Sequence, residues 1–127
     1  MIKIETVKPY KALDHFFDLQ KNGWRGSDVA HSIQLNDKKV LWLFGDTFVG
    51  EREQNCRGKN WVFLNNTIGI MDLKNNTPFD MKFYWGLNNS MPDAFFLTRK
   101  DIPGDFLWPT NGIVINDSLV IFCMAVN

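Results

Sequence analysis

The chain has 127 residues, of which 45% are hydrophobic and 22% are charged, and this balance is typical of a folded globular domain. Fourteen basic and fourteen acidic residues cancel, and no basic run stands out, so we expect no nucleic-acid partner. No stretch approaches the roughly 20 apolar residues of a transmembrane helix, so we expect no membrane span.

The aromatic content is the unusual part of the composition. Eleven Phe, five Trp and two Tyr residues favour β-structure, because aromatic rings suit a pleated, packed surface. Flat rings also stack on sugar faces, which suits carbohydrate recognition. An aromatic-rich core explains the same composition, and composition alone does not separate these two interpretations.

The first predicted element is a short helix over residues 11–21. Leu13, Phe16 and Phe17 recur at helical spacing, and the Asn-Gly pair that follows ends the pattern. The first residues lack the apolar segment of a signal peptide. The chain itself therefore carries no indication of secretion, and its residues leave the localisation open.

Four antiparallel strands are predicted next, joined in a meander. Their expected ranges are 29–35, 40–49, 61–73 and about 81–85. The first alternates apolar and polar residues, which indicates a half-buried strand. The second is apolar on both faces and must be covered on both sides. Polar segments at 36–39 and 74–78 predict turns, and residues 50–60 predict a polar loop.

A second unit begins after a long loop over residues 86–106. Strands are predicted at 111–115 and 119–126, with a turn between them. The chain stops after these two strands, and its last strand is apolar, which leaves an unpaired edge. Such a pattern is typical of a β-propeller whose ring is incomplete. A small sandwich closed by the six strands is the alternative.

Two aspartates stand out because each is the one acidic residue in an otherwise uncharged strand. Asp28 lies at the start of the first strand and Asp46 near the end of the second, so a turn at 36–39 brings both to one end of a hairpin. An ideal register places them on opposite faces. A longer turn or a single bulge, for which Gly45 is a natural position, brings both onto one face.

Paired carboxyl groups are what most glycoside hydrolases use. One carboxyl protonates the leaving oxygen, and the other acts as nucleophile or activates water. A structural interpretation is also open, in which Asp46 caps a turn with Thr47 and Asp28 forms an Asx-turn with Ala30. The two histidines have no partner at zinc-ligand spacing, so we expect neither a metal nor another cofactor.

The two cysteines lie in different settings. Cys56 belongs to a polar segment, whereas Cys123 belongs to the apolar run that ends the chain. We expect Cys123 to be a buried structural thiol. A disulfide between the two cysteines stays open.

Several motifs together resemble a known bacterial family. They are Trp24-Arg25-Gly26-Ser27-Asp28, Leu41-Trp42-Leu43-Phe44-Gly45-Asp46-Thr47-Phe48, Asn65-Asn66-Thr67-Ile68-Gly69-Ile70 and Trp108-Pro109-Thr110-Asn111-Gly112. Members of that family were long described as domains of unknown function. It is similar to the five-bladed β-propeller furanosidases, which include endo-acting arabinanases. The resemblance runs from about Asp14 to the last residue.

The resemblance implies an all-β fold, a five-bladed propeller with a central funnel. The chain corresponds to a first four-stranded blade, about 24–86, and the start of a second, about 107–127. Asp28 and Asp46 match the catalytic candidates, and a furanose-containing or related polysaccharide is the implied substrate. We expect this part of a ring to be inactive alone, and its open edge to meet further blades or another copy. The resemblance also suggests a secreted or periplasmic protein.

The resemblance also suggests residues that contact substrate. Arg25 and His31 flank Asp28 and are candidates to bind sugar hydroxyls, and Trp108 and Asn111 would face the same funnel. A structural role is an equally good interpretation of each. A non-catalytic carbohydrate-binding or scaffold propeller is the alternative to a hydrolase, because a fold does not fix a function.

Four further residues of these motifs have weaker assignments. Asn65 and Asn66 point toward the centre of the third strand, where a structural role is at least as good an interpretation as binding. Trp24 and Trp42 are expected to be core residues.

Overall fold

The computed structural model describes residues 6, 8–18, 23–53 and 56–127, with backbone only for 51–53 and 56–60. The short helical elements are η1 (Lys11–Leu13) and α1 (Asp14–Asp18). The strands are β1 (Trp24–Ser27), β2 (Ala30–Asn36), β3 (Lys39–Phe44), β4 (Thr47–Glu53), β5 (Cys56–Leu64), β6 (Thr67–Lys74), β7 (Thr77–Tyr84), β8 (Gly86–Asn88), β9 (Met91–Asp93), β10 (Phe106–Ile115) and β11 (Ser118–Val126). Strands dominate these elements, so the all-β prediction is confirmed.

A four-stranded antiparallel sheet is the centre of the structure. Its strand order is β2-β3-β6-β7, which confirms the predicted meander. The predicted turns at 36–39 and 74–78 are also confirmed, since β2 pairs with β3 and β6 with β7 across them. Asn75 and Asn76 both have positive φ in the second turn, a conformation that asparagine tolerates better than most residues.

A hairpin of β4 and β5 replaces the predicted polar loop at 50–60. Together with β1 it forms a three-stranded sheet of order β1-β4-β5, and β4 pairs with β5 out to Glu53 and Cys56. The prediction was wrong because a polar sequence also forms strands when a sheet face meets solvent. The single strands predicted over 40–49 and 61–73 are each two strands, interrupted at residues 45–46 and 65–66.

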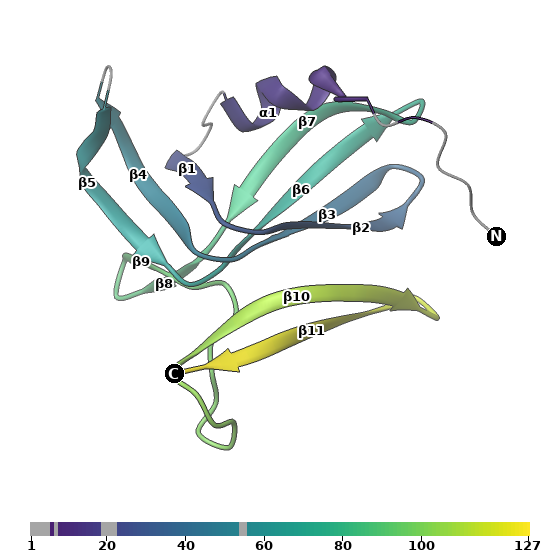
Figure 1. Cartoon of the computed structure of the whole chain (residues 1–127). Helices are drawn as coiled ribbons and strands as arrows, with labels where there is room; N and C mark the ends of the chain where they lie inside the picture. Colours follow the sequence, from purple (N-terminus) through teal and green to yellow (C-terminus); the bar gives the residue numbers. More distant parts are fainter. Residues whose placement is uncertain (1–5, 7, 19–22, 54–55) are drawn as a thin grey trace.

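The two faces of the four-stranded sheet are covered differently (Figure 1). Helix α1 covers one face, where the buried cluster is Phe16, Trp24, Phe44, Met71, Met81 and Phe83. The β10–β11 hairpin lies over the other face, where the buried cluster is Ile33, Leu41, Leu43 and Ile68, with Ile121 packed against it. Strand β3 contributes to both clusters, which confirms that its two apolar faces are covered.

The segment before the second unit also differs from the prediction. Residues 86–106 contain the short hairpin of β8 and β9, and β10 begins at Phe106 rather than at residue 111. The helix predicted over 11–21 is observed as η1 and α1, and residues 19–22 lie outside the described part. Among the described residues, no helix is long and apolar enough to cross a membrane.

The β10–β11 hairpin packs on the central sheet through a narrow strip. Gly112 approaches Ile33 so closely that an added Cβ would lie 2.6 Å from the isoleucine Cδ1. Ile113 and Phe122 are 47% and 54% exposed. None of the described sheets closes on itself. Cys123 is an exposed free thiol, so its expected burial is wrong, and the Cys56 side chain lies outside the described part.

A candidate carboxylate site at the strand interruptions

Asp28 and Asp46 occupy two of the positions where the long strands are interrupted. Asp28 lies between β1 and β2, and Asp46 lies between β3 and β4. The backbone joins the two positions, because the Asp28 N–H donates to the Asp46 carbonyl at 2.8 Å and the Gly45 N–H donates to the Asp28 carbonyl at 3.0 Å. The two aspartates are therefore direct neighbours across the ladder.

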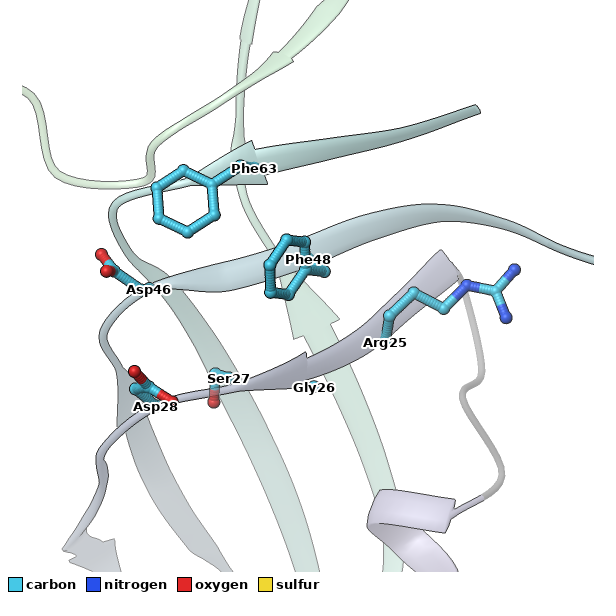
Figure 2. Close-up of a pocket in the computed structure, with 7 residues that line it drawn as sticks. All are labelled: Arg25, Gly26, Ser27, Asp28, Asp46, Phe48 and Phe63. Atoms are coloured by element: carbon cyan, nitrogen blue, oxygen red, sulfur yellow. The ribbon is translucent and has the colours of Figure 1, made fainter. Parts of the chain in front are cut away.

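The register of the hairpin settles which face each aspartate uses. Ala30 lies opposite Phe44, and this pairing continues without a shift to Gln34 opposite Val40. Extending it outward places Asp28 opposite Asp46, and opposed residues share a face. The ideal register is thus wrong and a shifted one holds. The register shift lies between Gln34 and Asn36, and the backbone is irregular again at Gly45, whose N–H donates to the Asp28 carbonyl. Figure 2 shows both carboxylates directed to the same side.

Two cavities adjoin the aspartates, and both aspartates line each of them. The first, of about 380 Å³, is also lined by Arg25, Gly26, Ser27, Phe48 and Phe63. The second, of about 390 Å³, is also lined by Val29, His31, Gly45, Trp108, Pro109, Thr110 and Met124. The carboxylates therefore stand between a cavity of the first unit and a cavity at its contact with the second.

Trp108 connects the second unit to the aspartate pair. Its indole Nε1–H donates to Oδ1 of Asp46 at 2.9 Å, and the contact is partly buried. A hydrogen bond to a carboxylate fixes the orientation of the acceptor group and is stronger than one between neutral partners. Trp108 and Asp46 are 62 residues apart in the sequence. The fold places Trp108 beside the aspartate pair, where the resemblance suggested it.

The other predicted contact residues lie in different places. The Arg25 Nε–H donates to the Gly50 carbonyl at 2.8 Å, and Figure 2 shows its guanidinium at the end of the pocket away from the carboxylates. His31 is exposed and lines the second cavity. Asn111 lines neither cavity, and its Oδ1 accepts the Gly112 N–H at 2.8 Å.

The capping interpretation of the aspartates does not match the contacts. Thr47 donates its hydroxyl to the Gly45 carbonyl at 2.6 Å and lies 3.0 Å from the Thr67 hydroxyl, so it is satisfied without the Asp46 carboxylate. Within the described residues, no hydrogen bond from a neighbouring backbone amide reaches the Asp28 carboxylate. Among the described residues, neither carboxylate therefore accepts a hydrogen bond from its own turn.

Asn66 has a structural role, which the sequence analysis weighed against a role in binding. It is fully buried, and its amide nitrogen donates to the carbonyls of Phe96 and Leu107 at 3.0 and 2.7 Å. Its oxygen accepts the Phe96 N–H at 2.7 Å. These bonds hold the segment between β9 and β10 against the first unit. Trp24 is buried as expected, and Trp42 is half-buried.

Some residues around the site were not predicted. Ser27, Val29, Phe48, Phe63, Thr110 and Met124 line the two cavities. Phe63 and Trp61 are two residues apart in the sequence, so on a strand their side chains share one face. This spacing could have indicated that Phe63 lies near the site. Within the part of the chain that the structure describes, no group of three or more His, Cys, Asp or Glu residues is placed to hold a metal ion.

Comparison with known proteins identifies a family to which the chain is similar. A family described as "Domain of unknown function (DUF5005)" matches residues 10–127, nearly the whole chain. No curated protein and no solved structure matches.

Proposed function

The chain belongs to the DUF5005 family, and we propose that it carries the catalytic carboxylates of a β-propeller glycoside hydrolase. The proposed substrate is a furanose-containing or related polysaccharide. The observation that carries the proposal is the placement of Asp28 and Asp46, which are opposed across one ladder and line the same two cavities. Most glycosidases act through such a pair.

The two carboxyl groups divide the chemistry between them. One, in its acid form, donates its proton to the glycosidic oxygen as the bond to that oxygen breaks. The other attacks the sugar carbon or removes a proton from the attacking water. A separation of about 5–5.5 Å leads to retention, and about 6.5–9.5 Å leads to inversion. Trp108, which donates to Asp46, acts in this proposal as a positioning residue.

The arrangement of the second unit supports the propeller. Strand β10 packs against the central sheet at Ile33 of β2, which is an edge strand of that sheet, as the inner strand of a following blade would. The outer apolar residues of the hairpin, including Ile113 and Phe122, are exposed. In a ring, the next blade covers such a face. Residues 24–86 are then the first blade, and 107–127 begin the second.

A non-catalytic carbohydrate-binding propeller is the second candidate. The observation that favours it is the pair of aromatic rings, Phe48 and Phe63, in the cavity that also holds the carboxylates. Rings of this kind bind sugar faces whether or not a reaction follows.

Substitution of each aspartate tests the hydrolase. Asp28→Asn and Asp46→Asn keep nearly the same shape but cannot supply the acid, the base or the nucleophile. We expect each to lower turnover of arabinan-type substrates at least about 10²–10⁴-fold in the full-length gene product, with an unchanged melting temperature. Asp37→Asn, at an exposed position in the β2–β3 turn, is the matched control and keeps full turnover. Full activity in both site variants would exclude the hydrolase.

A further inference from the structure

Three aromatic side chains form one cluster on the β4–β5 hairpin. The ring centroids of Phe48 and Phe63 are 5.4 Å apart and those of Phe48 and Trp61 are 5.0 Å apart, both pairs packed edge to face. Phe48 lies directly opposite Phe63 in the ladder, and Trp61 is two residues along the same strand. All three therefore share one face of the hairpin, here called the aromatic ledge.

The ledge is exposed although its rings are large. Trp61 is 44% and Phe63 is 45% exposed. The core lies on the other face of the same strands, where Val49 and Leu64 are buried. A hydrophobic core therefore does not account for Trp61 and Phe63, which stay exposed beside the half-buried Phe48. Large aromatic rings that stay exposed side by side mark a binding surface.

Glycines stand beside the rings on the neighbouring strands. Gly50 lies opposite Trp61, and Gly26 lies opposite Phe48 on β1. A Cβ added at Gly26 would meet no atom within 4 Å, so open space, not close packing, surrounds this position. Among the described residues, the positions paired with Trp61 on β4 and with Phe48 on β1 are glycines and place no side chain on this face.

The ledge is continuous with the carboxylate site. Phe48 and Phe63 line the same cavity as Asp28 and Asp46, and Figure 2 shows the two rings and the two carboxylates around it. Trp61 lies farther along β5, toward the tip of the hairpin. A ligand extended from the carboxylates over Phe63 would next meet the indole.

We propose that the aromatic ledge is a sugar-stacking subsite, which binds the part of a polysaccharide chain next to the bond at the carboxylates. Successive sugar rings stack on Phe63 and Trp61, and the chain runs from the aspartates along β5. This inference rests on the proposed function for the identity of the ligand. Carbohydrate is the occupant that the geometry favours, because separate ring faces lead into a cavity that carries two carboxylates.

Binding of arabino-oligosaccharides of increasing length to the full-length gene product tests the ledge. Trp61→Ala and Phe63→Ala remove one ring each, and we expect about tenfold weaker binding of the longer oligosaccharides, equivalent to about 1.4 kcal/mol. Oligosaccharides too short to extend beyond the cavity of the carboxylates to Trp61 bind equally to the wild type and the Trp61 variants. Trp61→Phe keeps a ring and most of the affinity. Phe79→Ala removes a 58% exposed ring on β7 and is the control, with unchanged binding.

The outcomes separate this inference from the proposed function. Weaker sugar binding by the ledge variants supports the ledge even if Asp28→Asn and Asp46→Asn leave turnover unchanged, a result that would remove only the hydrolase. Unchanged binding by both ledge variants, alongside aspartate variants that lose turnover, overturns the ledge alone. A change in sedimentation of Trp61→Ala without any change in sugar binding identifies the ledge as a protein contact and also overturns the inference.

Discussion

Asn66 connects the two units of the chain, and its removal gives a quantitative test of the structure. The side chain is fully buried and makes three hydrogen bonds, two to Phe96 and one to Leu107. Replacing it with alanine removes all three bonds and leaves one N–H and two carbonyl groups of the crossing segment without these partners.

The expected cost follows from the number of bonds. Each hydrogen bond contributes about 1 kcal/mol net, so three amount to about 3 kcal/mol. The three contacts are partly buried, so water can replace some of the lost partners, and we expect about 2–3 kcal/mol for Asn66→Ala. That is a large share of the about 5–15 kcal/mol that stabilises a typical domain.

Urea unfolding followed by tryptophan fluorescence measures this difference in the free energy of unfolding. Asn65→Ala is the matched control, because the neighbouring side chain is half-buried and makes no hydrogen bond among the described residues. Amide hydrogen exchange should accelerate most in β10 and β11, which the Asn66 bonds hold against the first unit. If Asn66→Ala lies within about 0.5 kcal/mol of Asn65→Ala, a range typical of inconsequential substitutions, the anchoring role is wrong.

Three further predictions concern the second unit. Trp108→Phe deletes the hydrogen bond to Asp46 and should lower the free energy of unfolding by about 1 kcal/mol, measured by urea titration; no change would mean the bond is not formed in solution. The chain should self-associate through the exposed face of the β10–β11 hairpin, and Phe122→Glu should reduce this in sedimentation; a wild-type monomer at every concentration contradicts it. Although Cys123 is exposed as a residue, partial burial of its thiol raises the pKa of that group. Because only the thiolate reacts, alkylation of Cys123 should be slow near neutral pH and should reach half its maximum at a higher pH than for a free cysteine, as followed by mass spectrometry; a midpoint at or below that of free cysteine would contradict it.

The strands that the sequence predicted well are those with a clear apolar period. The alternation at 29–35 and the apolar run from 40 onward correspond to β2 and β3. The β4–β5 extension was missed because its polar residues carry no period that marks a buried face. The interruptions at 45–46 and 65–66 were hidden inside continuous apolar runs, where tertiary contacts and not local composition decide that a strand ends.

The candidate site was predictable to the extent that it depends on one hairpin. The proximity of Asp28 and Asp46 follows from the turn between β2 and β3, whereas their shared face depends on an irregularity next to that turn. Phe63 could not be placed, because its position depends on the β4–β5 hairpin. The bonds of Asn66 to a segment 30 and 41 residues away leave no local signal in the sequence.

The strand interruptions place both aspartates beside the two cavities. Asp28 and Asp46 lie at interruptions between strands, and both line the two adjoining cavities. Val29, directly after Asp28, has a φ of 56°, which a β-branched residue adopts only at a cost of about 1–3 kcal/mol. Strain of this kind persists where surrounding contacts impose it, and it clusters at functional sites. The strained position, the shared face and the two adjoining cavities coincide at one aspartate pair, and this coincidence favours a functional interpretation of the pair over a purely structural one.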